Sequence, residues 1–287
     1  MRVGNNPLRG KNIDSFPPII ISVITHLPHQ GGYHAKRLQV VKLCLLSMRE
    51  ACGMDNVKVM VWDNGSCDEL LRWLHYDYRP DYIMTSPNVG KINARTAMLK
   101  MLPENTILAM CDDDMYFYQD WLKESVKLLR VFPRVGVVSG YPVRANFRWA
   151  TIKSIEWARK CEDAELEIGR FIPDRWEDDY AISLGRDIDF HRTYMMNDMD
   201  YRVTYTKYDK KYQAFLTAHH CQWLGYAGRL SKLMKYDYQA MADDKPFDNS
   251  IDNAGLLRLA TTQRYVRHIG NVLDDDIKDH AHVMGYM

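Results

Sequence analysis

Short apolar runs alternate with segments of helical periodicity through the first half of the chain. The runs predicted to be strands are residues 19–25, 57–62, 82–85, 107–111 and 135–139. Helical spacing of apolar positions follows the first run, and further helices are predicted over residues 91–101 and 120–132. Ser66 and Glu69 form a capping-box pattern that predicts a helix start after the second run. This alternation predicts an α/β fold, with a Rossmann-like, mostly parallel sheet flanked by helices.

The alternation weakens beyond about Gly140, where the sequence becomes rich in Tyr, Trp and charged residues. Helices are predicted over residues 149–168 and 224–241. No internal repeat, low-complexity tract or Gly/Ser linker divides the chain. We therefore expect residues 1–287 to form one unit with a less regular C-terminal region.

The amino-acid composition indicates which classes of protein are favoured and which are not. A hydrophobic content of 46% is ample for a packed interior, and 38 Lys plus Arg against 37 Asp plus Glu give a net charge of +1. This balance gives no global field that favours nucleic acid or an anionic membrane. The six cysteines show no C-x-x-C pair, and neither a signal-peptide pattern nor a membrane-spanning apolar stretch occurs. A cytoplasmic protein is expected.

Polar residues follow the predicted strands. They are Thr25 and His26, Asp63 and Asn64, residues 86–90, and the run Asp112, Asp113 and Asp114. In open parallel sheets, ligands bind outside the carboxyl ends of the strands. The sequence therefore predicts a nucleotide site at this edge.

The three consecutive aspartates are the sharpest candidate for chemistry. In an extended segment residues i and i+2 point the same way, so Asp112 and Asp114 can face one ligand. Carboxylate ligation favours Mn²⁺ or Mg²⁺, which leave positions open for phosphate oxygens. The alternative is a solvated acidic turn, but three adjacent acids repel one another and follow a buried run.

Several motifs in order resemble family 2 glycosyltransferases and relatives with the GT-A fold. They are the opening strand IIISVIT, VWDNGS at residues 61–66, NVGKINART at residues 88–96, and CDDDM at residues 111–115. The resemblance covers residues 17–145 and implies that this part binds a nucleotide-sugar donor. Residues 146–287 would then form the acceptor side.

The resemblance also implies roles for single residues. Thr25 lies where the first strand meets the nucleotide, and Asp63 matches the acid that contacts the nucleobase, usually uracil. The Asn-x-Gly-x-x-x-Ala-Arg pattern places Asn88 and Arg95 at the donor, with Lys91 one helical turn before Arg95. Asp112 and Asp113 would join the donor site, with Asp112 and Asp114 as metal ligands. A solvated helix face or a salt bridge is the alternative for the two cations.

The catalytic acid of such enzymes lies in a downstream Glu-Asp motif, and the nearest match is WEDDY at residues 176–180. Asp178 and Asp179 are the resulting candidates for deprotonating the acceptor hydroxyl. An acidic loop is the alternative, and the competing acids are Asp187, Asp189, Asp198 and Asp200. A downstream histidine completes the metal shell in some GT-A enzymes, which suggests His219 and His220, although such residues are more often core or surface.

The predicted activity is metal-dependent transfer of a sugar from a nucleoside diphosphate, with UDP favoured, to a hydroxyl acceptor. The acceptor stays open between a glycan, a protein and a hydroxymethylated DNA base, and for DNA we expect salt-dependent binding through Arg264 and Arg267. A sugar-nucleotide nucleotidyltransferase is the second enzyme candidate, although the loop THLPHQGGYHAKR lacks repeated glycines for a triphosphate. A non-catalytic carbohydrate- or nucleotide-binding module is the third.

Overall fold

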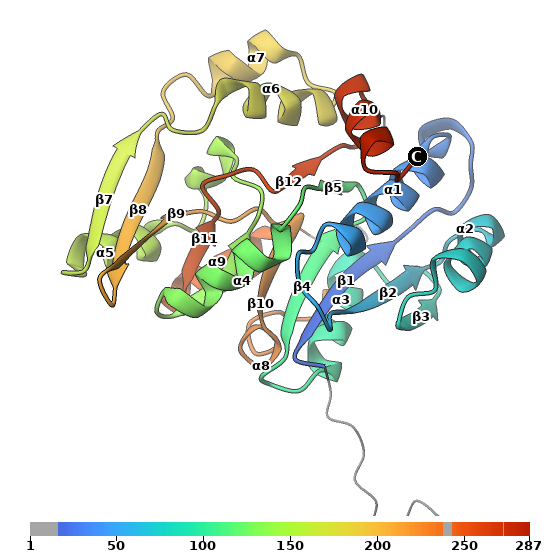
Figure 1. Cartoon of the computed structure of the whole chain (residues 1–287), viewed down its shortest axis with the longest axis horizontal. Coiled ribbons are helices and arrows are strands. Elements are labelled where there is room, and N and C mark those ends of the chain that lie inside the picture. Colours follow the sequence, from blue (N-terminus) through green and yellow to red (C-terminus); the bar gives the residue numbers. More distant parts are fainter. Residues whose placement is uncertain (1–16, 238–242, 272) are drawn as a thin grey trace, which may run out of the picture.

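The computed structural model describes residues 17–237, 243–271 and 273–287. Within them, a ten-stranded sheet has the order β3-β2-β1-β4-β10-β6-β11-β9-β8-β7, and β12 and β5 form a small second sheet (Figure 1). The strands are β1 Ile19–Thr25, β2 Lys58–Asn64, β3 Tyr82–Ser86, β4 Ile107–Asp112, β5 Met115–Phe117, β6 Val135–Ser139, β7 Ala164–Gly169, β8 Asp200–Lys207, β9 Lys210–Phe215, β10 Gln222–Tyr226, β11 Leu257–Ala260 and β12 Val266–His268. The α-helices are α1 Arg37–Glu50, α2 Asp68–Trp73, α3 Lys91–Met101, α4 Trp121–Val131, α5 Ile152–Lys160, α6 Asp174–Ser183, α7 Ile188–Tyr194, α8 Ala227–Leu230, α9 Lys245–Asn253 and α10 Asp275–Val283.

The α/β prediction is confirmed. Strands β3, β2, β1 and β4 are parallel neighbours, as are β6 and β11, whereas β10, β9 and β7 run the opposite way. All seven residues of β1 are buried, because helices cover both faces of the sheet at this point. Ile21 and Val23 pack with residues of α1 and α4, whereas Ile20 packs with residues of α3, α8 and α9.

The register of the parallel strands brings their carboxyl ends together. Thr25 is paired with Asp63 across β1 and β2, and Ile24 is paired with Asp112 across β1 and β4. Because these pairings are parallel, the loops that follow the three strands emerge at the same edge. The polar residues singled out in the sequence therefore lie on one side of the molecule.

The predicted helix over residues 224–241 is wrong in its first part. Leu224 lies inside β10, an antiparallel strand inserted between β4 and β6, and α8 is only four residues long. Residues 238–242 of that prediction lie outside the described part. A short apolar run such as QWLGY fits either a buried strand or a helix, and here tertiary pairing decides for the strand.

The prediction of one helix over residues 149–168 is also wrong. Helix α5 ends at Lys160, and the alternating sequence AELEIG forms β7, which pairs antiparallel with β8. Alternation of apolar and polar residues suits a strand with one exposed face. The capping box fails as well: Cys67 is the N-cap of α2, and the Ser66 hydroxyl accepts a hydrogen bond from the backbone N–H of Leu27.

Two elements from late in the sequence complete the edge where the loops converge. β12 pairs antiparallel with β5, directly after the triple aspartate, and α6 packs beside β12 (Figure 1). The backbone N–H of Ile269 donates to the carbonyl of Asp114 at 2.9 Å. Among the described residues, we find no helix with both the length and the apolar character needed to cross a bilayer.

Candidate functional site

The three aspartates face three different environments, although they are adjacent in sequence. Asp112 lies at the end of β4, where its carboxylate is 2.5 Å from the Arg95 guanidinium and 3.6 Å from the Lys91 amine. Asp113 and Asp114 follow in the tight connection to β5. Their side chains contact Arg37 of α1. The triple aspartate is therefore tied into ion pairs, which argues against a solvated turn.

Arg95 joins Asp112 to a second acid from far along the chain. Its guanidinium, which is fully buried, donates to Asp112 at 2.5 Å, to Asp244 at 2.6 Å and to the His220 carbonyl at 3.2 Å. Lys91 also contacts Asp244, at 2.7 Å, but 38% of its side chain is exposed. Arg95 thus orients two carboxylates from within the core, whereas Lys91 is the cation of this group that a ligand can reach.

These ion pairs determine the protonation states of Lys91 and Asp244. Burial lowers the pKa of Lys91, but Asp112 and Asp244 outweigh burial and raise that pKa above its ordinary value. Burial alone would raise the pKa of Asp244, yet Arg95 and Lys91 hold it below the ordinary range. Both Lys91 and Asp244 are therefore charged at neutral pH.

Asp113 is held away from solvent. Its carboxylate is ion-paired with Arg37 and accepts a hydrogen bond from the backbone N–H of His26 at 3.2 Å. Burial raises the pKa of Asp113, the Arg37 guanidinium lowers it, and the neighbouring Asp114 carboxylate adds to the rise. Asp113 consequently anchors the loop to β1 and α1.

Asp114 has one carboxylate oxygen engaged and one free. Oδ2 accepts from Arg37 at 3.0 Å and lies 3.5 Å from Nε2 of His268, whereas Oδ1 is buried and has no hydrogen-bond partner among the described residues. Burial raises the pKa of Asp114, but His268 and Arg37 outweigh it and hold that pKa well below the ordinary value. An ionised carboxylate with a free buried oxygen is a costly arrangement unless a cation or donor binds there.

His268 has the orientation expected of a metal ligand. Its Nδ1 lies 2.7 Å from the Ser183 hydroxyl, which leaves Nε2 facing Asp114. A second hydrogen-bonding partner of this kind fixes the ring of a ligating histidine. The pair of Asp114 and His268 therefore fits a divalent cation such as Mn²⁺ or Mg²⁺.

A cavity of about 480 Å³ opens onto this pair. Its walls include Asp114 and His268, Tyr33 from the loop after β1, Arg267 from β12 and Asp179 from α6. The Asp179 carboxylate is 2.5 Å from Arg264 and 3.2 Å from Arg267. The structure thus brings Asp179 into the cavity that contains Asp114.

The neighbouring Asp178 has a different position. Its carboxylate makes two hydrogen bonds to the Arg192 guanidinium of α7, at 2.6 and 2.9 Å, and Asp178 is not among the cavity residues. Three of the competing acids have structural partners: Asp187 caps α7, Asp198 pairs with Arg148, and Asp200 pairs with Arg144. Asp189 lies exposed on α7.

Thr25 and Asp63, which were predicted to contact the nucleotide, are buried and belong to a hydrogen-bond network. Asp63 accepts from the Thr25 hydroxyl at 3.2 Å and from the backbone N–H groups of Gly65 and Ser66. The Asn88 side chain, which is exposed, accepts from Asn64 at 3.0 Å and lies in the loop before Gly90, the N-cap of α3. The network holds the loops after β2 and β3 against each other, next to Lys91.

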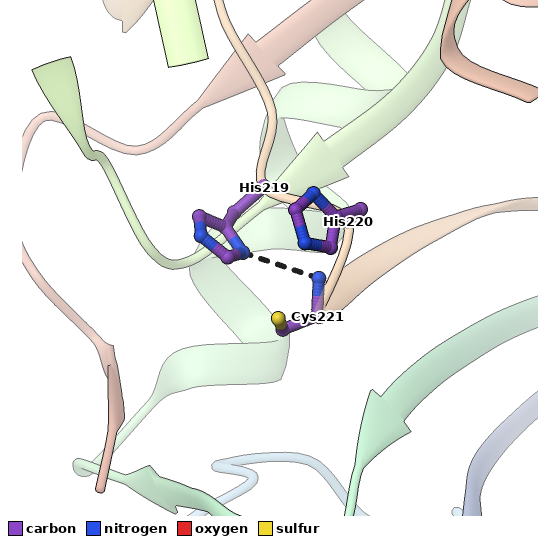
Figure 2. A group of neighbouring side chains, drawn as sticks. All are labelled: His219, His220 and Cys221. Atoms are coloured by element: carbon purple, nitrogen blue, oxygen red, sulfur yellow. Dashed lines mark hydrogen bonds between the residues drawn. The ribbon is translucent and has the colours of Figure 1, made fainter. Parts of the chain in front are cut away.

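His219 and His220 precede β10. Figure 2 shows their rings side by side, with the backbone N–H of Cys221 donating to Nδ1 of His219 at 3.1 Å. One ligand atom from each of His219, His220 and Cys221 lies within 4.8 Å of the others. Burial lowers the pKa of both imidazoles, so they are neutral near pH 7. The imidazole in contact with Asp114, however, belongs to His268.

Sequence reasoning missed three residues of the site: His268, Arg37 and Asp244. Each contacts the triple aspartate or its partners only because distant segments meet at this edge. His268 lies in the short strand VRH, where alternation gives no sign of a ligand. Only its place at a strand end could have suggested it.

The chain is similar over part of its length to known solved structures. A mannosyltransferase from Pyrobaculum calidifontis, PcManGT, solved in complex with GDP-Man and Mn²⁺, is 22% identical over 49% of this chain and 41% of that chain, with a TM-score of 0.35. TarS 1–349 of S. aureus is 18% identical over 42% of this chain and 34% of that chain, with a TM-score of 0.32. The present chain thus matches less than half the length of these structures. No curated protein matches.

The family model described as "Glycosyl transferase family 2" matches residues 34–183. This stretch contains β2 to β4, the triple aspartate and helix α6 with Asp179. It covers just over half of the chain. The protein therefore belongs to glycosyl transferase family 2.

Proposed function

We propose that this protein transfers a sugar from a nucleoside diphosphate donor to a hydroxyl acceptor in a reaction that depends on a divalent cation. The observation that carries the proposal is the carboxylate of Asp114, whose buried Oδ1 has no hydrogen-bond partner among the described residues and whose Oδ2 lies beside His268, in a cavity that also contains Asp179. The family match supports the same class of reaction.

Asp114 and His268 would hold the cation, and Ser183 would fix the His268 ring. When bound, Mn²⁺ or Mg²⁺ supplies positive charge that stabilises the leaving diphosphate. Arg95 fixes the Asp112 carboxylate by an ion pair, and the partly exposed amine of Lys91 is placed to contact an anionic donor group. His219 and His220 stay proposed as further metal ligands, and Mn²⁺ titration of variants that lack their imidazoles would test this.

Asp179 is the proposed general base. It lies in the cavity with Asp114, and Arg264 and Arg267 fix its carboxylate in place. The carboxylate would accept the proton of the acceptor hydroxyl as that oxygen forms its bond to the anomeric carbon and the diphosphate leaves. Asp178 would serve instead to attach α7 to α6 through Arg192.

UDP is the proposed nucleotide, on the strength of Asp63 and Thr25 at the carboxyl ends of β1 and β2. PcManGT was solved with GDP-Man, which makes GDP the second nucleotide to test. For the acceptor we propose a glycan rather than a modified DNA base. The arginines that a DNA acceptor would require, Arg264 and Arg267, are engaged with Asp179, and Arg267 is buried. We also propose that the protein is located in the cytoplasm.

The proposal is tested by calorimetric titration of nucleoside diphosphates and their sugar derivatives into the protein, with and without Mn²⁺. Wild type is compared with Asp114→Ala and with Asp189→Ala, a matched removal of an exposed acid on α7. We expect one nucleotide to bind only with metal, and only Asp114→Ala to abolish this binding. Failure of every nucleotide to bind, or equal binding without metal, would refute the proposal.

A further inference from the structure

A second cavity lies away from the triple aspartate. Its volume is about 310 Å³, and it is enclosed by α4, by strands β8 and β9, and by the loop of residues 261–265. This volume is at the lower end of the range for small-molecule sites, which is about 300–1,000 Å³. None of the residues assigned above to the donor, the metal or the base lines it.

The lining of this cavity combines aromatic rings with uncharged polar groups. Tyr212 and Tyr265 contribute rings, and Gln213, Gln263 and Thr262 contribute amides and a hydroxyl. The Gln213 amide donates to the Thr204 hydroxyl at 3.1 Å, which fixes the amide orientation on the cavity wall. Rings that pack against C–H faces, with amides that both donate and accept, match the surface of a sugar.

The charges at the cavity cancel. Lys127 pairs with Glu124 at 3.1 Å, and Lys211 of β9 lies 3.9 Å from Glu165 of β7, on the far side of β8. Each cation of the lining therefore lies near a carboxylate, so a phosphate or sulfate would meet little uncompensated positive charge. These contacts favour a neutral ligand over an anionic one.

The second cavity is connected to the catalytic cavity through β12. Tyr265 lines the second cavity, and Arg267 and His268, two and three residues later, line the first. Two to three residues of extended chain span roughly 7–10 Å, which is therefore the distance along the chain between Tyr265 and these two residues. The connection is also fixed, because Tyr265 donates its backbone N–H to Gly140 and accepts from Tyr118, each at 2.9 Å.

We propose that the second cavity is a carbohydrate-binding site that holds a neutral sugar unit of the acceptor, beyond the unit that receives the transferred sugar. This inference rests on the proposed function for its biological role. The binding itself can be tested without donor, metal or catalysis.

The test uses an array of neutral gluco-, manno-, galacto- and chito-oligosaccharides, together with sulfated and phosphorylated ones. Wild type and Asp114→Ala are both applied without nucleotide. We expect the same neutral oligosaccharides to bind both proteins. Gln213→Trp, which fills the cavity from an exposed strand position, should weaken this binding at least tenfold. Gln213→Ala should weaken it less.

Tyr208→Ala is the matched control, because Tyr208 lies in the turn of the same hairpin, is 87% exposed and does not line the cavity. It should bind as wild type does. Thermal melting of Gln213→Trp and its nucleotide binding by calorimetry should both stay unchanged. Absence of neutral oligosaccharide binding, a preference for the anionic sugars, or binding that Gln213→Trp leaves intact would overturn the proposal. Oligosaccharide binding without any nucleotide binding would instead refute the proposed function and leave this site standing.

Discussion

Nε2 of His268 lies 3.5 Å from Oδ2 of Asp114, and this contact joins a strand near the end of the chain to the loop after β4. The antiparallel pairing of β12 with β5 creates it, since His268 is paired with Met115, the residue after Asp114. One carboxylate and one imidazole thereby converge on a cavity, and the remaining oxygen of Asp114 is left for a ligand.

Removing either partner of this contact should weaken metal binding. We expect Asp114→Asn and His268→Gln to lower Mn²⁺ affinity by more than the roughly 10- to 100-fold typical of losing an outer-shell partner. Ser183→Ala removes such an outer partner of His268 and should fall within that range. Mn²⁺ titration followed by electron paramagnetic resonance measures all three. His282→Gln, in α10, is the control, and wild-type affinity in His268→Gln would contradict the assignment.

Substitution of Asp178 and substitution of the adjacent Asp179 should have different effects on kcat. Asp179→Asn should lower kcat about 10²- to 10⁴-fold while donor affinity stays unchanged, because a general base acts on the acceptor proton. Asp178→Asn should alter kcat only a few-fold, since that carboxylate faces Arg192. The comparison uses initial rates and donor titration for both variants. Equal losses of kcat would remove Asp179 from its proposed role.

Arg95→Met should destabilise the fold. The substitution leaves Asp112 and Asp244 without their shared buried cation, and breaking a buried ion pair costs about 3–5 kcal/mol. Urea unfolding reports the loss. Lys58→Met breaks the surface pair with Asp81 and should cost far less. An Arg95→Met variant as stable as Lys58→Met would show that the Arg95 contacts do not support the fold.

Asp248 should make stability depend on pH. Burial raises the pKa of Asp248 to about 6, from an ordinary value of 3.8, although the Arg258 guanidinium opposes the rise. The folded state holds this proton more tightly than the unfolded state, so the stabilisation is complete below about pH 4 and is lost as the pH rises through about 6. The change amounts to at most about 3 kcal/mol.

Asp248→Asn tests this dependence. The variant cannot ionise at this position, so its unfolding free energy should lack the decline between pH 4 and 6 that wild type shows. Urea unfolding across that interval, with carbon NMR of the wild-type carboxyl group, gives the comparison. Parallel pH profiles of the two proteins would show that the Asp248 pKa is not raised.

Gly225 should tolerate no side chain. A Cβ atom there would overlap the carbonyl oxygen of Gly136 and the side chain of Leu230, so Gly225→Ala should cost about 1–3 kcal/mol or more. Gly31→Ala is the control: its φ is −120°, and its Cβ would lie 3.7 Å from the nearest atom, on His29. Thermal melting distinguishes them, and equal melting temperatures would contradict the close packing of β10.

The sequence by itself determined strands β1 to β4 and β6 of the first half and the helices between them, although not the short strand β5. Fully buried runs such as Ile19–Thr25 are mostly apolar, and the polar residues that follow such runs lie at the strand ends. The three aspartates, Asp63 and the helix of Lys91 and Arg95 could therefore be assigned to one edge from local pattern alone. The family resemblance rested on these same residues.

Only the tertiary structure decided which segments from the second half complete that edge. β10 pairs with β4 and β6, and β12 places His268 next to Asp114. Both strands are short, and the sequence pattern of a short strand does not indicate which strands it pairs with. Which of Asp178 and Asp179 lines the cavity likewise depends on the way α6 faces it. Long-range pairing fixes these contacts, and the local periodicity of a sequence does not encode it.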